Sequence, residues 1–443
     1  MIPGDGYVDA TLTDIKNTLK QKWISVRGLV HRIESGNIES VKKDLLLFRF
    51  RRASLKNLFN KEESFKTSNP LTNRLPKFVV KIIGRRCLYL IYWFLTKLTL
   101  QDVRLRKREN KSYTKLLNET SAKGFIYQYF KKLMNSLVFS YYTYKFGQPR
   151  YLVGLSLLTT LPVDDKPILD LACGGGHTMH YLTHRFNKQP VIGMDRSFTK
   201  LYLAKKFVAP TGNYFCAEAD HTLPFEEGTF SGVFCSDAFG YFAYRKAAVF
   251  EMKRVLDQNG VIIITRILGE ELKYYRNFRI VSFDQLKRYF KDRMNIILEQ
   301  DHVLERYIQK KGPDLLNELP LKEMKHTGWL SIVASHRKDI FKVYGVFEEW
   351  PHAFGYLKLN PLYHETGRDE NGNVTFTFRF PDNWYAYEDS QWKKYAPETV
   401  KISKDTLEAI SKNIRTPEID DLISKCVVVG MPKKYLPSDH LLQ

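Results

Sequence analysis

Short runs of β-branched residues alternate with amphipathic stretches between residues 150 and 337. Because buried strands that alternate with helices are typical of a parallel sheet covered on both faces, this pattern predicts an α/β domain. Ala248, Met252 and Val255 share one face at helical spacing, which predicts a helix before the fifth strand. Asn259-Gly260 is expected to break the chain between that helix and the strand. The seven predicted strands span residues 167–171, 191–194, 213–218, 232–236, 261–267, 295–300 and 329–334.

The regions on either side of this domain have different patterns. Residues 1–149 are basic and aromatic with helical spacing, which predicts a mainly helical extension. Residues 338–443 predict a small α+β extension. In it, residues 374–380 alternate apolar and polar positions as a half-buried strand does, and Asn371-Gly372 before them is typical of a hairpin turn. Thr416-Pro417 predicts the start of a helix.

The positive charge is concentrated near the start of the chain. Of the net charge of +21, residues 1–150 contribute +19, from 30 Lys/Arg against 11 Asp/Glu. Residues 77–98 join an apolar stretch to basic ends, which predicts peripheral contact with an anionic membrane surface. The aromatic and lysine residues of 127–145 allow either RNA binding or a helical lid over the α/β domain. We favour the lid.

The five cysteines are scattered without a C-x-x-C pair, which favours a reducing compartment. The start of the chain lacks the features of a signal peptide, and the longest uncharged apolar run is too short for a membrane span. We therefore expect a cytoplasmic protein, in contact with the inner membrane surface if the 77–98 segment binds lipid.

A glycine-rich bend follows the first predicted strand, in the sequence Asp170-Leu171-Ala172-Cys173-Gly174-Gly175-Gly176. Glycines at a strand-to-helix turn permit positive φ and let a ligand approach the backbone. The spacing matches neither the dinucleotide fingerprint nor a P-loop. Two more acids follow the second and third strands, Asp195 and Asp220. A single acid after a strand is also typical of a turn or helix cap, but three after successive strands favour one shared site.

These residues resemble the acid-x-Gly-x-Gly-x-Gly signature of class I S-adenosylmethionine-dependent methyltransferases. Asp170, Gly174 and Gly176 match it, and Ala172 replaces the first glycine. The runs 223–230 and 235–242 resemble the branch that includes the ubiquinone and menaquinone C-methyltransferases. The resemblance covers roughly residues 150–337 and implies a seven-stranded, mostly parallel, Rossmann-like sheet.

The resemblance also implies a binding site for S-adenosylmethionine. In this superfamily the acid at Asp195 accepts the ribose hydroxyls, and the acid at Asp220 accepts the adenine amino group. The residues expected to bind the cofactor are Asp170, Ala172, Cys173, Gly174, Gly176, Asp195, Arg196, Asp220, His221 and Asp237.

The loop after the fourth strand is expected to face the transferred methyl group. Asp237 and Tyr241 are the catalytic candidates there, although Asp237 is equally typical of a turn and Tyr241 of a packing aromatic. His177, His180 and His184 share one helix face, opposite Met179, Leu182 and Phe186. We expect that histidine face to meet solvent or the cofactor, and we predict no metal site.

The sequence thus predicts a methyltransferase that acts on a small or amphiphilic, lipid-like acceptor. An RNA methyltransferase guided by the basic extension is the second hypothesis. A scaffold that keeps the fold without catalysis is the third.

Overall fold

The computed structural model describes residue 142 and residues 144–219, 222–269, 280–320, 322–324, 329–381 and 383–435. The predicted membrane segment 77–98 and most of the basic extension lie outside the described residues. Among the residues described, no helix is both long and apolar enough to cross a bilayer.

The centre of the molecule is a seven-stranded sheet with the strand order β3-β2-β1-β4-β5-β7-β6. Strands β1 to β5 are all parallel to one another, while β7 runs antiparallel to both of its neighbours, β5 and β6. The seven predicted strands are therefore all present, and the mostly parallel architecture is confirmed. Their bounds are β1 Ile168–Leu171, β2 Val191–Asp195, β3 Asn213–Cys216, β4 Phe230–Ser236, β5 Leu256–Leu268, β6 Met294–Glu299 and β7 Trp329–Ser335.

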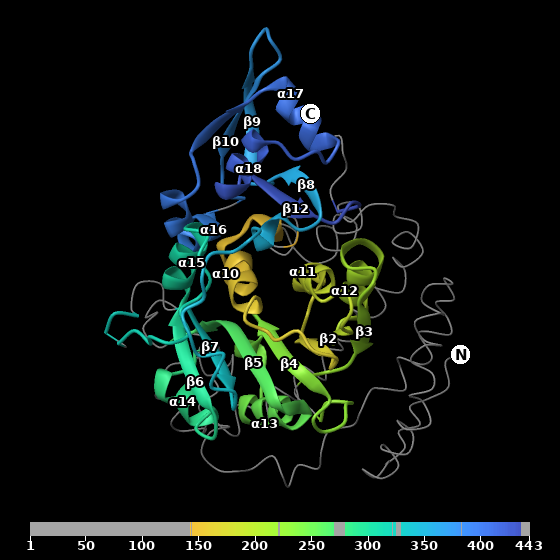
Figure 1. Ribbon diagram of the computed structural model, residues 1–443, viewed down its shortest axis with the longest axis vertical. Coiled ribbons are helices and arrows are strands. Elements are labelled where there is room, and N and C mark those ends of the chain that lie inside the picture. Colours follow the sequence, from red (N-terminus) through yellow and green to blue (C-terminus); the bar gives the residue numbers. More distant parts are fainter. Residues whose placement is uncertain are drawn as a thin grey trace, which may run out of the picture.

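Helices cover both faces of this sheet (Figure 1). One layer contains α10 (Pro149–Leu158), α11 (His177–Arg185), α12 (Phe198–Leu203) and α15 (Gln300–Ile308), with the short π-helix η4 (Ala204–Val208) after α12. The other layer contains α13 (Arg245–Val255) and α14 (Phe283–Tyr289), and the turn η5 (Phe239–Tyr241) follows β4. Each layer buries its own apolar cluster against the sheet, which is why the strands are apolar on both faces.

The fifth strand differs from the prediction. Asn259-Gly260 does not break the chain, because β5 begins at Leu256, which pairs with Phe230 of β4. The pairing shifts register before it reaches Gly232 and Val261. A strand irregularity therefore accommodates the two residues that were expected to form a turn.

The C-terminal region, which the structure describes from residue 338 to residue 435 except for residue 382, combines helices with two small antiparallel sheets. The predicted hairpin and helix start are confirmed: β9 and β10 pair on either side of Gly372, and the Thr416 hydroxyl caps the helix after it by accepting from the Ile419 N–H. The elements are η6 (Pro351–Ala353), β8 (Tyr356–Leu359), β9 (Tyr363–Arg368), β10 (Val374–Phe378), α16 (Asn383–Glu388), η7 (Ser390–Lys394), β11 (Thr399–Ile402), α17 (Lys404–Ser411), α18 (Pro417–Ser424) and β12 (Val428–Met431).

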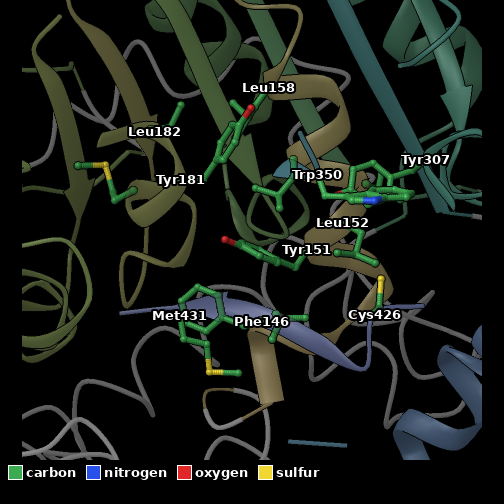
Figure 2. Packing of buried hydrophobic residues seen from close by; sticks show 14 of the residues in the cluster. Phe146, Tyr151, Leu152, Leu158, Tyr181, Leu182, Tyr307, Trp350, Cys426 and Met431 are labelled. Carbon is green, nitrogen blue, oxygen red and sulfur yellow. The ribbon is translucent and has the colours of Figure 1, made fainter. Parts of the chain in front are cut away.

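This region packs on the helical layer that holds α10, α11 and α15 (Figure 1). Figure 2 shows the apolar seam between them, where Phe146 and Tyr151 lie beside Met431, and Tyr307 lies beside Trp350. Phe146 belongs to the turn η3 (Lys145–Gly147), directly before α10. Because both sides of the seam belong to one buried cluster, the C-terminal region shares its core with the sheet domain.

Candidate functional site

The glycine-rich bend joins β1 to α11 at the carboxyl edge of the sheet. Ala172, Gly174 and Gly176 all have positive φ, at 60°, 56° and 78°. A Cβ on Gly176 would lie 2.6 Å from the Cβ of Ala204, so only glycine fits there. The bend thus brings bare backbone to the edge where open α/β sheets bind ligands.

Asp195, the last residue of β2, holds this bend in place. One carboxylate oxygen accepts the Gly174 N–H at 3.0 Å, and the other accepts the Ser197 N–H at 2.8 Å. A carboxylate oxygen has two lone pairs, so each oxygen can still accept one more hydrogen bond. The paired hydroxyls of a ribose would supply two such donors, which fits the role that the resemblance implies for Asp195.

Asp170 lies inside the domain at the end of β1, only 1 % exposed. Its carboxylate accepts a short hydrogen bond from the Thr178 hydroxyl of α11, which ties the strand to the helix after the bend. Burial raises the pKa of Asp170 to about 7, and the Thr178 hydrogen bond opposes that shift. A carboxyl group with this pKa can change its proton occupancy near neutral pH.

Tyr142 covers the bend from the side of the basic extension. A Cβ on Gly175 would meet the Tyr142 ring at 2.6 Å, and one on Gly174 would meet its hydroxyl at 3.5 Å. Burial raises the pKa of Tyr142 well above its usual range, and the charges of Asp195 and Asp237 add to the effect. Tyr142 is therefore close enough to both acids for their charges to act on its hydroxyl.

Tyr435 of the C-terminal region holds the backbone of Tyr142 in place. The Tyr435 hydroxyl donates to the Tyr142 carbonyl and lies 2.6 Å from Nε2 of His177. Burial lowers the pKa of His177 well below its usual range, which keeps this imidazole neutral.

Asp237 follows β4, with φ at 56°, and cations surround it. Its carboxylate lies 3.6 Å from Arg150, 3.9 Å from Lys145 and 4.0 Å from Arg266. Burial lowers the pKa of Lys145 to about 7, the Asp237 carboxylate raises it, and Arg150 lowers it further. The end of β4 thus carries a charged group of side chains directly beside the bend.

The structure brings together most of the residues predicted to bind the cofactor. Cys173 is buried in the bend, and Arg196 is exposed beside Asp195. Tyr241 is 51 % exposed on the turn after β4. Asp220 and His221 lie outside the described residues.

The histidine face of α11, predicted to meet solvent or the cofactor, is exposed to solvent only at His184. His177 and His180 are buried, as are Met179 and Leu182 on the opposite face. The His180 imidazole contacts the Phe354 carbonyl at 3.0 Å. The C-terminal region covers this helix, and the helical pattern of α11 by itself contains no information about such a cover.

Sequence reasoning missed several polar residues of this site. Thr178, only eight residues after Asp170, was missed. Arg150 and Asp389 gave no signal, because they are 239 residues apart in sequence. Arg266 did give one: it interrupts the apolar run of the fifth strand, and a charge inside a buried strand requires a partner.

This fold and this bend define the class of the domain: it is a class I S-adenosylmethionine-dependent methyltransferase domain. Residues 169–264 match the family model described as a methyltransferase domain, which starts one residue before Asp170 and ends within β5.

The related proteins are methyltransferases of different kinds. The chain is 29 % identical over 123 residues to the demethylmenaquinone methyltransferase of Thermotoga maritima, covering 28 % of this chain and 52 % of that protein. It is 30 % identical over 117 residues to the malonyl-[acyl-carrier protein] O-methyltransferase of Legionella pneumophila, covering 26 % and 41 %. The matches thus span about half or less of the length of these relatives.

Among solved structures, a methyltransferase dependent on the same cofactor from Aquifex aeolicus aligns with a TM-score of 0.32 and 15 % identity, over 43 % of this chain and 95 % of that one.

Proposed function

We propose that this protein binds S-adenosylmethionine at the bend after β1 and transfers its methyl group to a small or amphiphilic acceptor in the cytoplasm. The observation that carries the proposal is the contact between the Asp195 carboxylate and the Gly174 N–H. This contact supports the proposal because the Asp195 carboxylate, which can accept hydrogen bonds from ribose hydroxyls, lies against a bend in which Gly176 leaves no room for a side chain.

The residues of the chain divide the work of binding and orientation. Asp195 and the bend hold the nucleoside, and Tyr142 closes over them and excludes water. When bound, S-adenosylmethionine supplies an electrophilic methyl group on a good leaving group, so catalysis depends mainly on the position of the acceptor. Asp237 is the candidate to orient the acceptor or take its proton, since it follows β4 beside the lid.

The binding site is tested by calorimetry with S-adenosylmethionine. Asp195→Ala should weaken binding about 100-fold or more, because it removes charge-assisted hydrogen bonds to two hydroxyls. The matched control is Asp257→Ala, which removes an exposed carboxylate at the opposite end of the sheet. Equal affinity of the wild type and Asp195→Ala would refute the site.

The acceptor is tested by mass spectrometry of extracts from cells with and without the gene. A metabolite or lipid that lacks one methyl group in the deletion strain is the expected result. If the missing methyl group is found on an RNA nucleoside instead, the RNA hypothesis replaces the small acceptor.

A further inference from the structure

The segment between β3 and β4 is tied to α13 by two charged side chains. Glu251 and Arg254 are three residues apart on α13, so they lie on the same side of the helix. The Glu251 carboxylate accepts the Leu223 N–H at 2.7 Å. The Arg254 guanidinium donates to the Leu223 carbonyl at 3.0 Å and to the Phe225 carbonyl at 2.9 Å. These two side chains, the α13 clamp, thus bind both backbone groups of Leu223 and one of Phe225.

The members of the α13 clamp also hold each other. Arg254 donates to the two oxygens of Glu251, from Nε at 2.9 Å and from Nη2 at 2.7 Å. A bidentate pair of this kind fixes the orientation of both side chains. The Arg254 carbonyl adds a backbone contact, because it accepts the Gly228 N–H at 2.9 Å. The clamp therefore has a defined geometry that a single ammonium group could not reproduce.

The apolar side chains of this segment make the α13 clamp necessary. Leu223 and Phe225 are buried in the same apolar cluster as Met252 and Val255 of α13. Burying these side chains takes the backbone groups beside them out of water, so those groups need partners inside the protein. The clamp supplies the partners and sets where the segment lies against α13.

The other end of the connection is fixed beside the proposed nucleoside site. The Ala217 N–H donates to the carbonyl of Asp195 at 3.1 Å. Five residues, 218–222, therefore join this point to Leu223 in the clamp. Asp220 is the middle one and lies outside the described residues. It is three residues from either fixed end, so covalent geometry keeps its Cα within about 11 Å of both.

We propose that Glu251 and Arg254 are positioning residues, which hold this segment where Asp220 can accept the amino group of the adenine base. The inference rests on the proposed binding of S-adenosylmethionine and on the role that the resemblance implies for Asp220. Binding residues on loops depend on a second layer of contacts that fixes their position. The choice of base thus depends on α13, a helix that contributes no residue to the predicted cofactor contacts.

The experiment titrates the full chain in a calorimeter with S-adenosylhomocysteine, and separately with S-inosylhomocysteine. The second ligand has an oxygen where the adenine base has its amino group. The wild type should prefer the adenine ligand about tenfold or more, because the other ligand lacks a donor for a charged acceptor. Arg254→Lys should reduce this preference by about threefold or more, since lysine keeps the charge but replaces the fork with one nitrogen.

Further variants test whether the α13 clamp acts through Asp220. Glu251→Ala should reduce the preference for adenine as Arg254→Lys does, whereas Glu251→Gln keeps an oxygen for the Leu223 N–H and should restore part of it. Asp220→Ala should abolish the preference. Adding Arg254→Lys to Asp220→Ala should then cause no further loss of preference, because both changes remove the same contact.

The matched control is Lys253→Gln, on the same helix. The Lys253 ammonium donates to the Tyr289 carbonyl at 2.6 Å and pairs with Asp292, so it ties α13 to α14 instead. This control should lower the melting temperature and leave the preference for adenine unchanged. If Arg254→Lys does not fold, Glu251→Gln decides, and its preference should lie below that of the wild type.

The remaining outcomes overturn the inference in distinguishable ways. A clamp variant that melts at a lower temperature but prefers adenine as strongly as the wild type shows that the clamp only stabilises the fold. Equal binding of both ligands by the wild type removes the selection of the base and leaves the methyltransferase proposal intact. Failure of the wild type to bind S-adenosylhomocysteine refutes the proposed function, and the inference with it.

Discussion

At the scale of single residues, Ala172 shows why the family signature has glycine at its position. Its φ of 60° costs an alanine about 1 kcal/mol or more, a cost that glycine does not incur. Ala172→Gly should therefore raise the free energy of unfolding by about 1 kcal/mol, measured by urea denaturation. Ala247→Gly, an exposed position within α13, should lower it by a similar amount. Destabilisation by both substitutions would contradict the strain at Ala172.

The buried acid at Asp170 predicts a pH-dependent stability. Its pKa is about 7 in the folded protein and lies near 4 in the unfolded chain, so the folded state binds more protons between these values. Its contribution to stability therefore falls as pH rises from about 4 to 7 and is lowest above that range. The neutral variant Asp170→Asn should be more stable than the wild type at pH 8, by about 1–4 kcal/mol, and the gain should shrink toward pH 5.

Denaturant unfolding at several pH values measures this difference. Asp257→Asn is the control, because its hydrogen bond from Lys166 lowers the pKa of the Asp257 carboxyl group. This control should show no gain at pH 8. A gain at pH 8 that is the same for both variants would disprove the specific effect of burial at Asp170. We expect Asp170→Asn to lose cofactor affinity, because stability and function conflict at such a position.

At the scale of elements, the sequence determined the sheet well because each strand is buried on both faces. All seven strands were predicted within a few residues except the start of β5, where Asn259-Gly260 is part of an irregular strand. Local patterns also predicted the cap of α18 and the β9–β10 hairpin. These features depend on neighbours in sequence, so a single sequence contains the information for them.

The candidate site could be predicted only where it depends on the strand ends. Asp170, Asp195 and the bend follow from strand positions and the family signature. The side chains that surround Asp237 do not, since Lys145, Arg266 and Asp389 meet only through the packing of three separate regions. The bulge that redirects Arg266 also depends on its pairing with β7. Contacts between distant parts of the chain leave no periodic trace in the sequence.

At the scale of the whole molecule, Tyr435 of the C-terminal region contacts two residues beside the proposed cofactor site. The Tyr435 hydroxyl contacts both the His177 imidazole and the Tyr142 carbonyl, so it links the C-terminal region to the start of α11 and to Tyr142. Because Tyr142 packs on Gly175, a looser Tyr142 would leave the bend less covered. The C-terminal region would then be required for tight cofactor binding, although it contributes no residue to the predicted nucleoside contacts.

Tyr435→Phe tests this link. It removes the hydroxyl that contacts the buried His177 imidazole and donates to the Tyr142 carbonyl, so the free energy of unfolding should fall by about 1–3 kcal/mol. Affinity for S-adenosylmethionine, measured by calorimetry, should fall as well, because Tyr142 loses its anchor. Tyr363→Phe is the matched control: its hydroxyl donates to the Pro397 carbonyl within the C-terminal region, so its loss should reduce stability but not cofactor affinity. If both variants bind the cofactor as tightly as the wild type, the C-terminal region stabilises the fold without closing the site.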